Sequence, residues 1–371
     1  MSENNFVKLG DVARECRLTW SGGQTDIPIV GLEHLVPGEI ELSSWDSNIE
    51  HTFSKKFLKG QVLLGRRRVY LKKAVVAPCD GICSGDITVI ESTGGILPEL
   101  LPFVIQNDRF FDYAMQGSAG SLSPRVKWEH LKNYEFSLPP LAEQKVLADK
   151  LWAAYRLKES YKKLLAATEE MVKSQFIEMF GTIDEPKVEV KNLIDVVLSS
   201  GQYGSNTSAT DYQEGKPRYI RITDINDDGS LNDDIKTAEV IEDKYRLIPG
   251  DIVFARTGAT VGKTYMHETG NAIYAGYLIK YQMNESKMKP AFMKAFTHSK
   301  TYYNWVANSQ KVGAQPNISA AQYDNMPVLV PQIEKQEEFL AICHQADKSG
   351  FELRESIKSI DKVIKSLINI I

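Results

Sequence analysis

Two long segments of the chain repeat apolar residues at steps of three and four. The first runs from about Leu141 to Phe180, and the second from about Ile333 to Ile371. Steps of three and four place side chains on one face of an α-helix, so both segments are predicted to be helical. Gly181 and Pro186 mark the end of the first helix, because glycine commonly caps helices and proline cannot continue one.

The second helix has the more regular apolar seam. Its seam positions are Cys343, Ala346, Gly350, Leu353, Ile357, Ile360, Ile364, Leu367 and Ile371. A lone helix of this kind would expose an apolar stripe to water. We therefore expect it to pair with the first helix of the same chain as an antiparallel coiled coil; packing on its own domain and pairing with another subunit are the alternatives. The expected packing residues are Leu151, Tyr161, Leu165, Val172, Leu353, Ile357, Ile360, Ile364 and Leu367.

Short apolar runs precede each long helix. The runs that read as strands are Val62–Leu64, Ala74–Val76, Ile87–Ile90, Asp251–Phe254 and Tyr277–Tyr281. Gly, Asp, Asn and Pro separate them, as is typical of turns between strands. Each half of the chain is therefore predicted to be a mixed domain of strands and short connections, followed by one long helix.

The two halves also repeat one another. Residues 56–66 (KFLKGQVLLGR) match residues 246–256 (RLIPGDIVFAR), with Arg66 opposite Arg256 at an offset of 190. Residues 139–144 (PPLAEQ) match 331–336 (PQIEKQ), and Pro124-Arg-Val matches Pro316-Asn-Ile, both at an offset of 192. Residues 28–35 (PIVGLEHL) resemble residues 218–225 (RYIRITDI). A repeat this long indicates tandem domains rather than a solenoid.

The predicted fold class is α+β: two tandem α/β domains, each followed by a long helix, with the helices paired. The expected boundaries are 1–140 for the first domain, 141–182 for the central helix, 183–331 for the second domain and 332–371 for the last helix. A length of 371 residues is consistent with two or three such units.

The overall charge of the chain does not indicate a nucleic-acid-binding protein. The net charge is −4 and the isoelectric point about 6.0, and residues 1–140 and 181–331 each carry −2. Nucleic-acid-binding domains are often basic, so any such contact must come from local clusters or be supported by a partner. We find no apolar run of 18 residues, no signal peptide and too few cysteines (four) for a disulfide framework. A cytoplasmic protein is expected.

Three short segments resemble ligand-binding motifs but lack a required spacing or ligand. Gly258-Ala-Thr-Val-Gly-Lys263 has three residues between its glycines where a phosphate-binding loop needs four, so we expect a glycine-rich hairpin. The segment from Asp224 opens like a calcium loop, but its twelfth position is Ile235. Cys79 and Cys83 lack further ligands for zinc. The chain shows no motif for binding S-adenosylmethionine or for catalysis, so neither metal nor cofactor is expected on it.

Taken together, the repeated halves and their junctions resemble the specificity subunit of type I restriction–modification enzymes. The first junction is Leu138-Pro139-Pro140-Leu141-Ala142-Glu143-Gln144. The second, Val330-Pro331-Gln332-Ile333-Glu334-Lys335-Gln336, departs from the pattern at Lys335. Further matches are Tyr219–Ile225, Pro249–Ile252 with Arg256–Gly258, and Gly85–Ile87 with Arg66–Arg68.

The resemblance implies a non-catalytic subunit whose two target-recognition domains each read half of a split, asymmetric site on double-stranded DNA. It implies that the helix pair holds the domains apart and docks two copies of a modification (methyltransferase) subunit, which bind S-adenosylmethionine and methylate adenine at N6. It also allows for two motor-nuclease subunits. A 40-residue helix spans about 60 Å, longer than the roughly 34 Å between successive major-groove sites. The pair could therefore act as a ruler.

Candidate DNA contacts gather at the repeated arginine and on polar loops, because Arg suits guanine edges and Lys suits phosphates. The loops are 121–127 and 310–317, and strand alternation would place Arg66 and Arg68 on one face with Arg67 opposite. The candidate residues are Arg66, Arg67, Arg68, Lys72, Lys73, Arg125, Lys127, Arg221, Arg256, Thr257, Lys263, Gln315 and Asn317. A coiled-coil adaptor that binds only protein, and an enzyme without recognisable motifs, are the rival interpretations.

Overall fold

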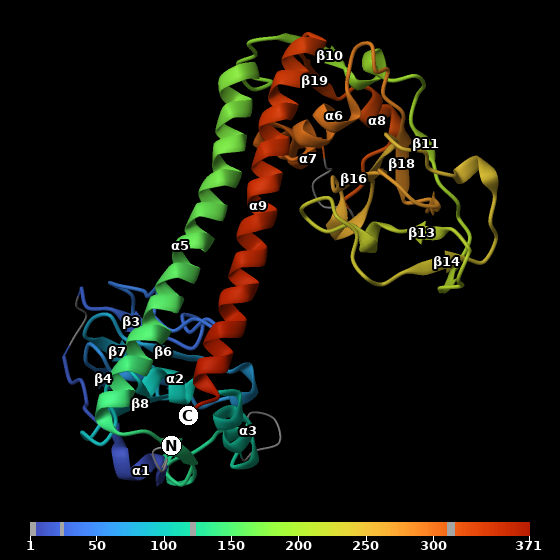
Figure 1. Cartoon of the computed structure of the whole chain (residues 1–371). Coiled ribbons are helices and arrows are strands. Elements are labelled where there is room, and N and C mark those ends of the chain that lie inside the picture. Colours follow the sequence, from blue (N-terminus) through green and yellow to red (C-terminus); the bar gives the residue numbers. More distant parts are fainter. Residues whose placement is uncertain (1–4, 23–25, 119–123, 310–315) are drawn as a thin grey trace. The chain divides into compact units, whose positions relative to one another are not determined.

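The computed structural model describes residues 5–22, 26–118, 124–309 and 316–371 (Figure 1). The chain forms two compact units. Unit 1 comprises Met1–Leu164 together with Glu352–Ile371, and unit 2 comprises Leu165–Phe351. Each long helix therefore contributes to both units. Among the described residues, no helix combines the length and apolar character needed to cross a bilayer.

Unit 1 is built around a four-stranded sheet of order β2-β8-β5-β6, whose paired strands are all antiparallel. Its elements are β1 (Asn5–Lys8), α1 (Leu9–Val12), β2 (Ala13–Cys16), β3 (Ile29–Val30), β4 (Lys55–Phe57), β5 (Val62–Gly65), β6 (Ala74–Val76), β7 (Gly81–Cys83), β8 (Ile87–Ser92), α2 (Leu101–Ile105), α3 (Asp108–Gln116), α4 (Trp128–Leu131), β9 (Glu135–Leu138) and the first part of α5 (Leu141–Phe180). β1 pairs antiparallel with β9, and β3 pairs parallel with β7.

Unit 2 has a four-stranded sheet of order β11-β18-β15-β16, again antiparallel throughout. Its elements, after the second part of α5, are β10 (Glu189–Asn192), β11 (Gln202–Tyr203), β12 (Ala209–Asp211), β13 (Arg218–Ile220), β14 (Lys236–Ala238), β15 (Ile252–Ala255), β16 (Thr264–Met266), β17 (Ala272–Tyr274), β18 (Leu278–Tyr281), α6 (Pro290–Thr297), α7 (Lys300–Ser309), α8 (Ala320–Asp324), β19 (Pro327–Val330) and α9 (Ile333–Ile368). β10 pairs antiparallel with β19, and β13 pairs parallel with β17.

The two units share one topology. β5 and β15 both lie inside their sheets, and each pairs with the strand after it and with the last strand of the sheet. Two helices, a short helix, an edge strand and a long helix then follow in the same order in each unit. The internal repeat that the sequence indicates is therefore a repeat of structure.

The helices α5 and α9 pack together in opposite directions (Figure 1). In unit 1 the Lys158 ammonium lies 2.7 Å from the Asp361 carboxylate, and in unit 2 the rings of Phe180 and Phe339 are 5.5 Å apart. Positions rise along α5 as they fall along α9, so the pair is antiparallel. The observed bounds of α5 coincide with the predicted ones, whereas α9 ends at Ile368.

The predicted packing residues lie on the covered faces of these helices. Leu151 is fully buried, and the other eight are half-buried. Val172 packs against the core of unit 2, and Ile364 and Leu367 pack against the core of unit 1. Each core thus includes residues of both long helices.

A buried glutamine joins each long helix to its own unit. Gln144 accepts a hydrogen bond from the Leu97 N–H (2.9 Å) and donates to the Pro139 carbonyl (2.9 Å). Gln336 accepts from the Lys289 N–H (2.8 Å) and donates to the carbonyls of Lys287 and Pro331 (both 2.9 Å). The repeated Gln of the two junctions therefore fixes the start of a helix against the end of its sheet domain.

We expect Gln336→Ala to lower the free energy of unfolding of unit 2 by about 2 kcal/mol, because the Lys289 N–H and the carbonyls of Lys287 and Pro331 lose their buried side-chain partner. Urea unfolding of the full chain measures this. Gln332→Ala is the matched control, since Gln332 is exposed at the same helix start. Equal losses in the two variants would show that the buried bonds contribute nothing.

Candidate nucleic-acid interface

The repeated arginines lie at one equivalent place in each unit, which we call the corner. The corner of unit 1 comprises residues 66–68, 86 and 124–126, and that of unit 2 comprises residues 256–258, 277 and 316–318. The same three backbone hydrogen bonds hold both. In unit 1 they join Arg66 N–H to Asp86 O (2.9 Å), Arg68 N–H to Pro124 O (2.9 Å) and Val126 N–H to Arg66 O (3.0 Å). In unit 2 they join Arg256 N–H to Tyr277 O (3.1 Å), Gly258 N–H to Pro316 O (3.0 Å) and Ile318 N–H to Arg256 O (2.8 Å).

The prediction that Arg66 and Arg68 share a strand face is wrong. β5 ends at Gly65, and Arg68 has a left-handed backbone with φ +52°. This conformation ends the alternation of a strand and leads into the 3₁₀ turn η1 (Val69–Leu71). The three arginines therefore lie on a turn beyond the sheet rather than on an edge strand.

Arg66 and Arg256 are both half-buried, and both have a buried Nε–H without a hydrogen-bond partner among the described residues. The guanidinium of Arg256 lies over the Tyr203 ring, 4.8 Å from its centre. Buried donors in proteins are nearly always paired, so two unpaired Nε–H groups at one repeated position call for an explanation.

A carboxylate organises the other arginines of the unit 1 corner. Asp86 accepts two hydrogen bonds from Arg125 (2.7 and 3.2 Å) and lies 3.6 Å from Arg67. The hydrogen bond from Arg125 lowers the pKa of Asp86, and the charges of Arg125 and Arg67 act in the same direction. A lowered carboxyl pKa stabilises the fold above the ordinary value near 4, and this contribution is lost as the pH falls through the folded value. Asp86 is therefore ionised at neutral pH.

We expect Asp86→Asn to raise non-specific DNA affinity about threefold, because it frees positive charge for phosphate. The slope of log affinity against log salt concentration should become steeper by about one. Titration of the assembled complex with unrelated DNA at several salt concentrations measures both. Asp112→Asn, at an exposed position on α3, removes the same charge elsewhere. An unchanged slope in Asp86→Asn would place the corner away from phosphate.

Several predicted contacts are instead held within the chain. Lys73 donates to the Leu32 carbonyl (2.7 Å), and Lys263 pairs with Asp227 (2.8 Å) and donates to the Ile225 carbonyl (3.3 Å).

Arg221 and Lys72 are also paired. Arg221 lies beyond the end of β13, where its guanidinium binds Asp224 and Asp234. Lys72 forms an ion pair with Asp108 (2.6 Å). The structure thus brings together Arg66, Arg67, Arg68 and Arg125, but places Arg221 and these lysines in other contacts.

The remaining predicted residues divide between the corner and the surface. Thr257 and Asn317 form an antiparallel bridge at the unit 2 corner, as Arg67 and Arg125 do in unit 1. Lys127 is exposed at the start of α4. Gln315 lies outside the described residues.

Sequence reasoning did not single out three corner or near-corner residues, Asp86, Tyr203 and Tyr277. Asp86 and Tyr277 each precede the strand that follows the corner, at an offset of 191, so the repeat could have revealed them. Tyr203, by contrast, comes next to Arg256 only through the pairing of β11 with β18. No local signal marks it.

The glycine motif at residues 258–263 joins two antiparallel strands, as expected. Gly258 and Gly262 have φ of +71° and +87°. Their counterparts in unit 1 are Arg68 and Lys72, with φ of +52° and +51°. The left-handed conformation costs roughly 1–2 kcal/mol for a residue with a Cβ, so unit 1 places basic side chains where glycine folds more easily.

Two other places in unit 1 gather polar groups or form a hollow. Glu33, His34 and Asp46 gather their polar atoms within 4.8 Å. However, His34 Nδ1 accepts from the Gly31 N–H (2.9 Å), so the neutral ring carries its proton on Nε2, 3.5 Å from Asp46. That nitrogen offers Asp46 a proton rather than offering a metal a lone pair.

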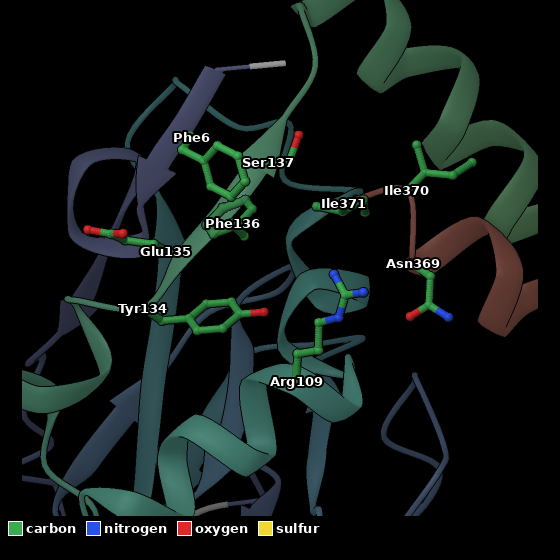
Figure 2. Close-up of a pocket in the computed structure, with 9 residues that line it drawn as sticks. All are labelled: Phe6, Arg109, Tyr134, Glu135, Phe136, Ser137, Asn369, Ile370 and Ile371. Carbon is green, nitrogen blue, oxygen red and sulfur yellow. The ribbon is translucent and has the colours of Figure 1, made fainter. Parts of the chain in front are cut away.

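The second place is a hollow of about 430 Å³ in unit 1, which Figure 2 shows between Phe6, Tyr134 and Arg109 and the chain end at Asn369–Ile371. The Ser137 N–H donates to the Ile371 carbonyl there (3.0 Å). Its only carboxylate side chain, Glu135, lies 4.0 Å from Lys8, and its lining contains no histidine or cysteine. We interpret the hollow as a surface depression that forms where the last three residues of the chain, after α9, pack against unit 1.

Comparison with known proteins shows similarity to one class, the DNA-specificity subunits of type I restriction enzymes. A model of the type I restriction modification DNA specificity domain matches residues 185–361. The chain is 22% identical over 305 residues to the type I restriction enzyme EcoBI specificity subunit of Escherichia coli, covering 71% of this chain and 64% of the relative. It is also 22% identical over 280 residues to the EcoKI specificity subunit of Escherichia coli (strain K12), covering 68% and 60%.

Solved structures show the same fold. The type I restriction–modification S subunit from M. genitalium superposes with a TM-score of 0.62 at 12% identity, covering 99% of this chain and 96% of that one. A chain from a study of assembly and conformational transition of a type I R-M system gives 0.60 at 18% identity, covering 98% and 96%. The resemblance inferred from the repeated motifs is therefore confirmed: the chain is similar to type I specificity subunits, and its alignments span less than two thirds of the curated relatives' length.

Proposed function

We propose that the chain is the DNA sequence-specificity subunit of a type I restriction–modification complex. The domains at residues 1–140 and 183–331 each read one half of a bipartite, asymmetric site on double-stranded DNA. The helices at 141–182 and 332–371 join them and dock two modification subunits, which bring S-adenosylmethionine and methylate adenine at N6. Two motor-nuclease subunits complete the restriction form. The chain itself positions DNA and partners and performs no chemistry.

The observation that carries this proposal is the repeated arginine. Arg66 and Arg256 occupy the same place in two copies of one fold, and each has a buried Nε–H that no acceptor of the described chain satisfies. An arginine guanidinium can make the two-donor contact that guanine O6 and N7 accept. Two such corners in one chain are what a reader of two half-sites requires.

Partner docking is supported by an exposed apolar row on α5. Leu157, Leu164 and Met171 follow one another at heptad spacing, and their exposed fractions are 46%, 53% and 48%. Residues seven apart lie on one side of a helix, so these side chains form one stripe. The negative net charge of each half also favours a partner that supplies phosphate contacts.

The proposal is tested by assembling the chain with its modification subunits and sequencing the adenines that the complex methylates in genomic DNA. We expect one split motif, together with salt-sensitive binding that prefers it. Assembly without any sequence preference would favour the coiled-coil adaptor, and methylation by the chain alone would favour an enzyme.

We also expect the helices to set the unread gap of the motif. Deleting seven residues from each of α5 and α9 removes about 10 Å of helix, or roughly three base pairs, while keeping the heptad register. Methylome sequencing should then show both half-sites unchanged with a shorter gap. A seven-residue deletion in α5 alone leaves the two helices unequal in length, so their residues no longer pair along both units and assembly should be abolished. An unchanged gap in the double deletion would contradict the expectation that the helices set the gap.

A further inference from the structure

The two corners have the same backbone hydrogen bonds, and their side chains differ at four positions that carry a polar group in at least one unit. A fifth differing pair, Val126 and Ile318, is apolar and buried in both units. The shared residues are Arg66 and Arg256, and Pro124 and Pro316. The differing pairs, matched by the hydrogen bonds described above, are Arg67 and Thr257, Arg68 and Gly258, Asp86 and Tyr277, and Arg125 and Asn317. One scaffold thus presents two different sets of polar groups.

We propose that these four positions determine which bases each unit prefers, while the shared arginine makes a contact common to both. This inference rests on the proposed function and deepens it by assigning specificity to residues. The unit 1 set is Arg67, Arg68, Asp86 and Arg125; the unit 2 set is Thr257, Gly258, Tyr277 and Asn317. The first set is rich in guanidinium groups, which pair with guanine. The second offers an amide, which pairs with adenine, and a threonine, whose methyl group packs on thymine.

The geometry of the unit 1 set supports this assignment. Asp86 accepts from both Arg125 Nε and an Nη group, so it holds that guanidinium in one orientation. The same carboxylate lies 3.6 Å from Arg67. Arginine side chains whose direction is fixed before binding discriminate between bases better than mobile ones, because less freedom is lost on contact. In unit 2 no carboxylate occupies the position of Asp86, and the set is uncharged.

Arg68 provides an independent observation. Its φ of +52° is a left-handed conformation that residues with a Cβ rarely adopt, and its counterpart Gly258 has a φ of +71°. Glycine would therefore satisfy the turn of unit 1 at lower energy. Strained residues of this kind cluster at functional sites. An exposed arginine kept at such a position indicates that its side chain is used.

The decisive experiment exchanges one set for the other. The variant carries Arg67→Thr, Arg68→Gly, Asp86→Tyr and Arg125→Asn in the full chain, assembled with its modification subunits. Sequencing of methylated adenines should show that one half-site loses guanine preference and moves toward the other half-site, which itself stays unchanged. A normal motif in this variant would overturn the proposal.

Two further variants keep the test sharp. Arg14→Thr with Arg17→Asn removes the same net charge from exposed side chains of unit 1 outside the corner, and should leave the motif unchanged. Arg68→Gly alone should raise the Tm of the chain, because the strain is relieved, yet lower discrimination at the same half-site at least fivefold. A lowered Tm, or unchanged discrimination, would overturn the role of Arg68. This single variant therefore tests the proposal even if the fourfold variant does not fold.

Failure of this inference is distinct from failure of the proposed function. If the unaltered chain directs no sequence-specific methylation, the proposed function is wrong. If it does so, and the exchanged chain keeps the same motif, only the assignment of the four positions is wrong.

Discussion

In the assembled complex, Arg66→Ala is expected to weaken discrimination at one half-site by about 1–3 kcal/mol, because a fixed two-donor contact to a base edge is lost. The other half-site should keep its preference, since the proposed function assigns its reading to Arg256 in the second copy of the fold. Competition binding with oligonucleotides that vary one half-site at a time measures both effects in the same preparation.

The reciprocal variants make this result specific. Arg256→Ala should relax the other half-site by a similar amount. Arg66→Lys keeps the charge but loses the forked pair of donors. It should therefore reduce base discrimination nearly as much as Arg66→Ala does, while keeping more of the affinity for phosphate. A uniform loss of affinity for every sequence in Arg66→Ala would show instead that Arg66 contacts the DNA backbone.

The largest stability effect is expected for Phe176→Ala, at about 3–5 kcal/mol in the free energy of unfolding. Phe176 lies on the part of α5 that belongs to unit 2 and is 4% exposed. Its ring centre lies 5.4 Å from that of Phe339 and 5.7 Å from that of Phe292. Its removal leaves a cavity where helix α5, helix α9 and the second domain meet, and under the proposed function the half-site assigned to unit 2 should be lost with it.

Urea unfolding of the full chain measures this loss. The neighbouring residue provides the control: Ile177 is 46% exposed on the same helix, so Ile177→Ala should change stability by less than about 0.5 kcal/mol. Equal effects of the two substitutions, or a Phe176→Ala loss below 1 kcal/mol, would mean that the helix does not share the core of unit 2.

Much of the fold could be predicted from local patterns. Periodicity over forty residues predicted the bounds of α5, because the apolar seam and the glycine after the helix are local features of one continuous segment. The parallel pairs β3 with β7 and β13 with β17 could not be predicted. Each joins runs of two or three residues across more than fifty positions, and no feature of so short a run specifies its partner.

The candidate site divides in the same way. The equivalence of Arg66 and Arg256 follows from the repeat, and the backbone hydrogen bonds confirm it. The partners of long basic side chains depend on tertiary structure, so Lys73 and Lys263 read as possible DNA contacts although both bind carbonyl groups of their own units. The turn at Arg68 depends on a single dihedral angle that an arginine seldom adopts, which is why strand alternation was the wrong expectation there.

The composition of unit 1 has a consequence for synthesis on the ribosome. Its core includes Ile368 and Ile371 as well as Leu151 and Tyr155, yet unit 2 is encoded between them. At translation rates of about 5–20 residues per second, the first domain waits roughly 10–40 s for the side chains that complete its interior. Unit 2 receives all its residues without such an interruption. Nascent chains should therefore protect the later half from protease before the earlier one.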